Sequence, residues 1–164
     1  MRTVFADANY WIGLFNPRDQ LHAIALTASR KLGKTRLVTS EMVLVEVLNS
    51  LAEYIGLRAS MIAAVDAISA NPNTEVVPQT AMLFRDALGF YRAHQDKEWG
   101  LTDCSSFIIM RQRGLTEALT FDRHFEQAGF RALLREDAIH TPSDGHEHPG
   151  SWTCPTTLLP STPL

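Results

Sequence analysis

Residues 99–122, WGLTDCSSFIIMRQRGLTEALTFD, have the pattern of a turn, a helix and a short strand that ends in an aspartate. Thr102 is suited to cap the helix, and Asp103 in the first turn suits the positive end of its dipole. Gly114 is expected to stop the helix. The apolar run before Asp122 predicts a strand, and open α/β sheets bind ligands outside the carboxyl ends of their strands. The stretch therefore places an acidic side chain where such folds carry their chemistry.

The same pattern opens the chain, because residues 2–6 predict a strand and Asp7 follows at once. Apolar spacing, turn residues and caps such as Ser40 predict further elements along the chain. The expected helices cover residues 8–15, 19–32, 40–55, 57–70, 79–94, 102–113 and 123–128, and the expected strands cover 37–39, 75–77, 118–121 and 130–134. This alternation predicts an α/β domain with a mainly parallel sheet and helices on both faces.

The composition is that of an ordinary globular protein. The chain has 164 residues, of which 45% are hydrophobic and 20% charged, with a formal net charge of -3. Without a global basic field, contact with nucleic acid would have to come from a local patch. The two cysteines fit neither a disulfide framework nor a zinc site. No apolar run approaches the ~20 residues that span a bilayer, so we expect a cytoplasmic protein with no membrane contact.

The C-terminal part has a different character. Residues 136–164 hold five of the eight prolines and show no periodicity, so we expect a folded domain over residues 1–135 and an irregular tail over 136–164. His140, His146, His148 and Cys154 lie in this tail. A metal site there is conceivable, but the pattern favours a polar tail without ligand-orienting structure.

Glu46 is the most informative single residue, because it lies within the apolar run MVLVEVL. A helix that is apolar all round is expected to be buried on most sides. A carboxylate buried there must be paired, protonated or bound to a metal. The alternative is that Glu46 reaches solvent along a polar edge shared with Asn49 and Ser50. With strand-end aspartates available, we favour a metal site.

Asp7, Glu46, Asp103 and Asp122 then form the predicted constellation of catalytic and metal-binding residues. Sites made of carboxylates alone select Mg²⁺ or Mn²⁺ over zinc. Such ions polarise phosphoryl oxygens and activate water, so the chemistry implied is hydrolysis of a phosphodiester. For each aspartate taken alone, a helix cap or a turn is the alternative role.

Four segments carry a resemblance to a known family: VFADANYWIGLFN, VLVEVLN, WGLTDCSSFIIM and ALTFDRHF. They resemble the acidic motifs of PIN-domain ribonucleases, most of all the VapC-type toxins of bacterial toxin–antitoxin pairs, over residues 1–134. The resemblance implies a three-layer α/β/α fold and an Mg²⁺- or Mn²⁺-dependent endoribonuclease that cuts RNA by metal-activated water. It also implies a homodimer and a cognate antitoxin. Thr120 would support the last acid, and Asn9 stands where many such domains have Ser or Thr.

Three other interpretations stay open on the sequence alone. A phosphatase of the haloacid dehalogenase type also places an aspartate after a strand, but it would want a second aspartate where Asn9 stands. A non-catalytic module could use the acids to receive an arginine of a partner. Cys104 and His124 could form a nucleophilic pair, although a lone cysteine on a buried helix is more often a small apolar residue. Arg123 and His124 could also contact RNA phosphates.

Overall fold

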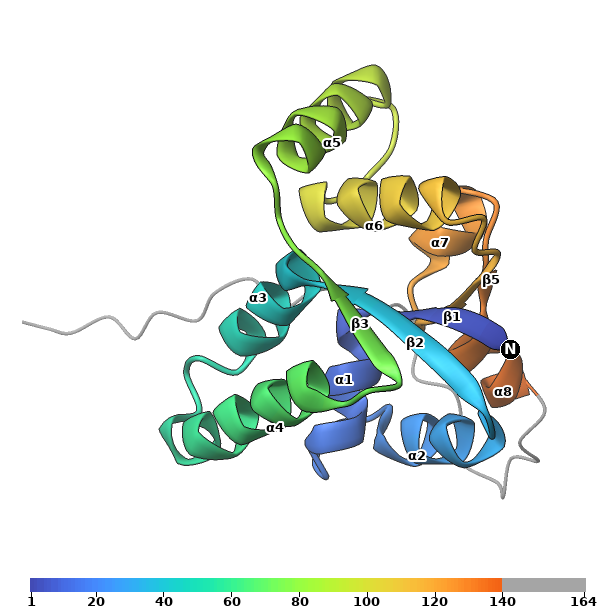
Figure 1. Cartoon of the computed structure of the whole chain (residues 1–164). Coiled ribbons are helices and arrows are strands. Elements are labelled where there is room, and N and C mark those ends of the chain that lie inside the picture. The colour runs from blue at the N-terminus through green and yellow to red at the C-terminus, as the bar shows by residue number, and fades with distance from the viewer. Residues whose placement is uncertain (140–164) are drawn as a thin grey trace, which may run out of the picture.

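The computed structural model describes residues 1–139 and is built on a five-stranded sheet (Figure 1). All strand pairs are parallel and the strand order is β3-β2-β1-β4-β5. The strands are β1 (Arg2–Ala6), β2 (Thr35–Ser40), β3 (Thr74–Val77), β4 (Glu117–Leu119) and β5 (Arg131–Ala132). In β1, the central strand, the side chains of Val4, Phe5 and Ala6 are fully buried, as expected where helices cover both faces of a parallel sheet.

Helices cover both faces of this sheet. The helices are α1 (Ala8–Phe15), α2 (His22–Lys31), α3 (Glu41–Ser50), α4 (Arg58–Ala70), α5 (Ala81–Ala93), α6 (Leu101–Gln112), α7 (Arg123–Gln127) and α8 (Leu133–Ile139), with a 3-10 turn at Ile55–Leu57. Helices α6 and α7 lie over one face, with α5 packed against α6, while α1, α2 and α4 lie over the other (Figure 1). The predicted three-layer α/β/α fold is confirmed. None of the helices within residues 1–139 has the length and apolar character needed to cross a membrane.

A chain of aromatic contacts fixes α6 and α7 to the sheet. The ring of Phe107 on α6 meets the ring of Phe125 on α7 edge to face, with centroids 5.0 Å apart. Phe125 in turn lies 6.2 Å from Phe5 on β1. All three side chains are fully buried, and aromatic pairs of this geometry stabilise a core beyond the area they bury. The packing therefore sets where the N-termini of α6 and α7 lie relative to the end of β1.

The helix predicted over residues 40–55 begins as expected but ends early. The Ser40 hydroxyl accepts the Val43 N–H at 3.2 Å, which confirms Ser40 as the cap. The helix stops at Ser50, whose hydroxyl donates to the Val47 carbonyl and competes for the last turn of helical hydrogen bonds. Ile55, expected on the apolar stripe, is 83% exposed. Its helical spacing was therefore misleading, because the chain has already left the helix.

Two other boundaries differ from the sequence prediction. The cap of α6 is Gly100 rather than Thr102, because the Asp103 carboxylate reaches back to accept the Gly100 N–H at 2.8 Å. Only Arg131–Ala132 of the expected strand 130–134 is extended, and α8 follows directly with Leu134 fully buried.

The predicted irregular tail therefore begins inside a helix. Glu136 on α8 forms an ion pair with Arg131, and Asp137 forms one with Lys31. The ordered part of the chain thus extends at least to the end of α8. The rest of the predicted tail, with His140, His146, His148 and Cys154, lies outside the described residues.

Candidate active site

Asp7 is the most deeply placed of the four predicted acids. It follows β1, begins α1 and is only 4% exposed. Its Oδ2 accepts hydrogen bonds from the Thr120 hydroxyl at 2.8 Å and from the Asn9 side-chain amide at 3.2 Å. Burial raises the pKa of Asp7 above its ordinary value, and the charge of Asp122 adds to this, while the hydrogen bonds oppose it. Asn9 therefore contacts the first of the predicted acids through its side chain.

Asp122 is positioned by the turn that follows β4. Its backbone N–H donates to the Thr120 hydroxyl at 3.0 Å, and its Oδ1 accepts the backbone N–H of His124 at 2.8 Å. The second contact makes Asp122 the cap of α7. The capping role considered for each aspartate is thus real here, and it leaves Oδ2 facing the neighbouring side chains. Thr120 contacts both strand-end acids, which agrees with the supporting role that the family resemblance implies.

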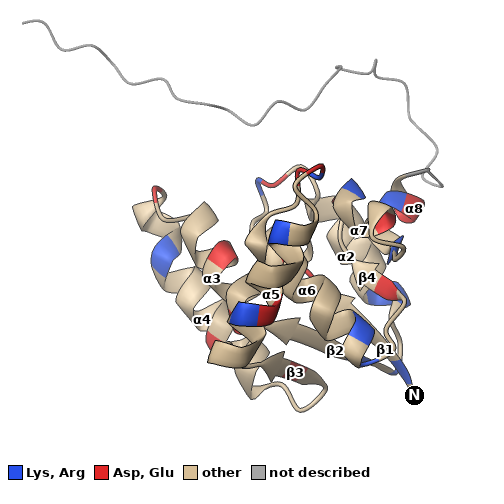
Figure 2. Cartoon of the chain, turned by 90° about the horizontal axis from the view of Figure 1, so that it is seen from above, with Lys and Arg blue, Asp and Glu red and all other residues tan. Residues whose placement is uncertain are grey.

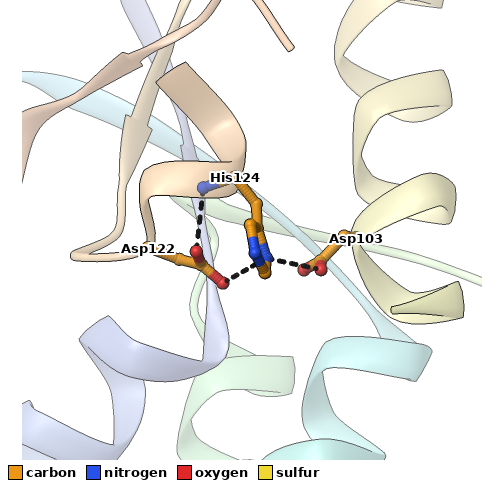
Figure 3. Close-up of side chains that lie close together, drawn as sticks. All are labelled: Asp103, Asp122 and His124. Atoms are coloured by element: carbon orange, nitrogen blue, oxygen red, sulfur yellow. Dashed lines mark hydrogen bonds and ion pairs between the residues drawn. The ribbon is translucent and has the colours of Figure 1, made fainter. Parts of the chain in front are cut away.

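Asp103, on the first turn of α6, faces Asp122 across a histidine. The His124 Nδ1 lies 3.3 Å from Asp103 Oδ2 and 3.2 Å from Asp122 Oδ2 (Figure 3). One ligand atom from each of these three residues lies within 4.8 Å of the others, a spacing that could hold a metal ion. From the sequence, His124 was considered as a phosphate contact and as the partner of Cys104, but not as a residue between the two acids. The sequence contains one signal for its closeness to Asp122, because His124 follows Asp122 by two residues. When Asp122 caps α7, the first residues of that helix lie against the Asp122 side chain.

Glu46 corrects the burial argument made from the sequence. It is exposed, and so are its neighbours Val45 (51%) and Leu48 (37%), because α3 buries only the side that carries Val43, Leu44 and Val47. The carboxyl group nevertheless faces the other acids. Partial burial of this group and the negative charges of Asp7, Asp103 and Asp122 raise the pKa of Glu46 to about 7. A hydrogen bond from the Thr102 hydroxyl acts in the opposite direction and lowers this pKa.

The four acids act on one another as a group. Burial raises the pKa of Asp103 to about 6, with further contributions from Asp7 and Asp122, while the Gly100 N–H and His124 act in the opposite direction. For every pair among Asp7, Glu46, Asp103 and Asp122, the negative charge of one residue raises the pKa of the other. The structure therefore places all four predicted acids close enough for their charges to act on one another, although only Asp103 and Asp122 share the metal-sized group with His124. Oxygen-rich clusters of this kind can bind a hard divalent cation.

Cys104 does not fit the nucleophile considered from the sequence. Its side chain is fully buried in α6. Burial and the neighbouring charge of Asp103 raise the pKa of the Cys104 thiol to about 11. A reactive cysteine needs an accessible thiolate, and this thiol remains protonated at neutral pH.

Comparison with known proteins agrees with this geometry. Residues 4–131 match the model of the PIN domain family. The chain is 34% identical over 129 residues to the "23S rRNA-specific endonuclease VapC20" of two Mycobacterium tuberculosis strains, which covers 77% of this chain and 95% of the relative.

Solved structures give the same result. The crystal structure of Mycobacterium tuberculosis VapC20, described as a sarcin–ricin loop cleaving toxin, superposes with a TM-score of 0.70 and 30% identity over 77% of this chain and 95% of that one. FitAcB from Neisseria gonorrhoeae shares the fold, with a TM-score of 0.51 and 20% identity over 79% of this chain and 94% of that one. The chain therefore belongs to the PIN-domain family, with VapC-type toxins among its relatives, as its acidic motifs predicted.

Proposed function

We propose that this protein is an Mg²⁺- or Mn²⁺-dependent endoribonuclease that acts as the toxin of a toxin–antitoxin pair. The observation that carries the proposal is that Thr120 links Asp7 to Asp122 and His124 links Asp122 to Asp103, with the charge of Glu46 acting on the same group from α3. The name of the relative VapC20, a 23S rRNA-specific endonuclease, supports RNA as the substrate class. The match covers 95% of that relative.

The donor set fits a hard divalent cation. Asp7, Asp103 and Asp122 offer carboxylate oxygens, Glu46 approaches from α3, and burial with mutual repulsion raises the pKa of three of these groups. A cation would relieve that repulsion, so the cluster is better suited to a bound metal than to four free acids. When bound, it would polarise a phosphoryl oxygen and favour in-line attack by water. We therefore assign these four residues as the metal-binding and catalytic acids.

The remaining residues of the site orient these acids. Thr120 and Asn9 fix the carboxylate of Asp7, and the backbone of α7 fixes that of Asp122. The imidazole of His124 lies between the carboxylates of Asp103 and Asp122. A cation bound by both carboxylates would therefore either contact this ring or displace it. We propose His124 as a positioning residue rather than a nucleophile.

Contact with RNA phosphates has to be local. In Figure 2 the Lys and Arg segments are spread over several elements and do not gather on one face, in line with the net charge of -3. Arg123 adjoins Asp122 at the rim of the site, and its guanidinium is held by Glu98 at 3.1 Å. We propose that Arg123 contacts a phosphate next to the scissile one, since such contacts set the register of a nucleic acid.

The partners follow from the family. We propose a homodimer that is inhibited by a cognate antitoxin, and an arginine of that antitoxin placed among the four acids. A bidentate arginine suits a cluster of carboxylates and would compete with the metal. The name of VapC20 makes the sarcin–ricin loop of ribosomal RNA the first substrate to test.

A cleavage assay with defined product ends tests the proposal. Purified protein is incubated with ribosomal RNA and with a sarcin–ricin stem-loop, in Mg²⁺, in Mn²⁺ and in EDTA, beside Asp103→Asn. We expect metal-dependent cuts that leave 5′-phosphate and 3′-hydroxyl ends and that survive 2′-deoxy substitution at the scissile position. Products with 2′,3′-cyclic phosphate, or full activity in EDTA, would contradict it. Hydrolysis of p-nitrophenyl phosphate without RNA cleavage would favour the phosphatase, and neither activity would favour a binding module.

A further inference from the structure

An open groove of about 440 Å³ adjoins the acid cluster between α3 and the first turn of α6. Glu46 lines it and its charge acts on the other three acids, so the groove borders the acid cluster through this one residue. Asn49 and Ser50 follow Glu46 by three and four residues and therefore share its face of α3. Met42 and Val45 supply an apolar wall, with Val45 51% exposed.

A second groove, of about 430 Å³, shares the lining residue Ser50 with the first. It lies between the end of α1, the loop that follows it and the segment after α3. Ser50 lines both grooves, so the two meet at this residue. The second groove contains Tyr54, which is 58% exposed, and the exposed Arg18. Asp19 also lines it, and its Oδ1 accepts the Leu21 N–H at 2.8 Å.

We infer that these grooves together form a track for single-stranded RNA, here named the α3 track and defined by Val45, Asn49, Ser50, Tyr54 and Arg18. The nucleotide beside the scissile phosphate places its base against the apolar wall, with the base edge at the Asn49 amide. The next base stacks on Tyr54, and its phosphate meets Arg18. This inference rests on the proposed ribonuclease function and adds which residues select the nucleotides.

The chemistry of the two grooves matches this occupant. Unpaired bases stack on aromatic side chains and present their edges for hydrogen bonding, and this is how proteins recognise single-stranded RNA. An asparagine amide has both donors and an acceptor, so it can distinguish one base edge from another. A tyrosine ring accepts any base, because every base has a π-face. The two side chains should therefore have different effects. Asn49 should determine which base is preferred next to the cut, and Tyr54 should raise the cleavage rate whatever the base.

A hairpin RNA with a randomised loop separates these effects. Cleavage rates are measured for wild type, Tyr54→Ala, Tyr54→Phe and Asn49→Ala, and the cut products are sequenced. Tyr54→Ala should lower kcat/KM about tenfold with the base preference unchanged, and Tyr54→Phe should restore the rate. Asn49→Ala should flatten the preference at one position next to the cut. Both alanine variants should keep the rise in melting temperature caused by Mn²⁺, because neither removes an acid.

Tyr91→Ala is the matched control, since Tyr91 is 47% exposed on α5 and lines neither groove. The inference is wrong if Tyr54→Ala and Asn49→Ala cleave with wild-type rate and preference, or change only as Tyr91→Ala does. It is also wrong if Tyr54→Ala leaves cleavage intact and instead abolishes inhibition by the co-expressed antitoxin, which would assign the track to a protein partner. No cleavage of any loop by wild type would contradict the proposed function itself.

Discussion

The Thr120 hydroxyl donates a 2.8 Å hydrogen bond to Oδ2 of Asp7, a residue 113 positions away in the sequence. Both residues are buried, Thr120 completely. The same hydroxyl accepts the backbone N–H of Asp122 at 3.0 Å. One small side chain in the turn directly after β4 thus fixes the acid that follows β1 relative to the acid that follows β4. The geometry of the site is set as much by this neutral residue as by the acids.

Thr120→Val should disturb the site while keeping its shape. The change removes the hydroxyl that Asp7 and Asp122 share, so the free energy of unfolding should fall by about 1–3 kcal/mol. The rate of RNA cleavage should fall more than about tenfold. A misplaced carboxylate raises the barrier of the reaction by more than the free energy of the lost hydrogen bond. Chemical denaturation and the RNA cleavage assay measure the two effects.

Thr27→Val is the control for this substitution. Thr27 is exposed on α2, and its hydroxyl donates only to the Ala23 carbonyl of the same helix. A surface change of this kind should alter stability by no more than about 0.5 kcal/mol and leave cleavage unchanged. Equal effects of the two substitutions would mean that Thr120 has no special role in the site.

Much of the fold could be predicted because its signals are local. The strand 2–6 and the helix 8–15 have the bounds that the sequence predicted, since Asp7 marks the turn between two apolar segments. The meeting of Asp7 and Asp122 follows from a rule of topology, because the carboxyl ends of adjacent parallel strands lie at one edge. The closeness of Asp7 and Asp122 could therefore be predicted without knowledge of any contact between helices, whereas Glu46 and Asp103 lie on helices and the strand rule does not place them.

The features that were missed depend on packing between distant elements. The place of His124 between Asp103 and Asp122 requires α6 and α7 to meet through Phe107 and Phe125, which no local pattern encodes. The exposure of Glu46 was missed for a similar reason. Apolar residues around a helix indicate burial only if another element covers them, and no element within residues 1–139 covers Val45, which is 51% exposed.

The stability of the metal-free protein should depend on pH through the acid cluster. The pKa of Asp103 is raised from 3.8 to about 6 and that of Glu46 from 4.5 to about 7, and the pKa of Asp7 is also raised. The folded state then binds more protons than the unfolded state in this range, so the free energy of unfolding should fall as pH rises from about 4 to about 7. Urea denaturation in EDTA at a series of pH values measures it.

Other groups contribute with the opposite sign, so the comparison must be made between variants. Arg2 holds the pKa of Glu117 below its ordinary value, and that contribution rises with pH. In Asp103→Asn and Glu46→Gln, the free energy of unfolding should therefore fall less steeply with pH than in wild type. The contribution of Glu117 is the same in all three proteins. Parallel curves for wild type and both variants would show that the acids do not repel one another as described.

The end of the folded domain should lie after α8 rather than before it. A protein ending at residue 139 keeps Leu134, which is fully buried, and the ion pair of Asp137 with Lys31. It should fold and cleave RNA as the full chain does. Leu134→Ala in the full chain should lose about 2–5 kcal/mol of stability by leaving a cavity. Thermal melts compare the three proteins, and a shortened protein that precipitates would place part of the fold in residues 140–164.

The central claim is that the acids bind a divalent metal, and melting curves with and without Mn²⁺ test it most directly. Bound metal stabilises only the folded state, by ~2.7 kcal/mol at 100 times its dissociation constant. Asp103→Asn keeps an oxygen that can accept the Gly100 N–H and removes one repelling charge. Asp66→Asn, an exposed change on α4, is the control.

In EDTA, Asp103→Asn should melt at or above wild type. Added Mn²⁺ should raise the melting temperature of Asp103→Asn less than that of wild type or of Asp66→Asn. Asp103→Asn should also fail to cleave RNA. If Asp103→Asn instead melts lower in EDTA and gains as much from Mn²⁺ as wild type, then Asp103 is only the cap of α6 and the metal site is wrongly assigned.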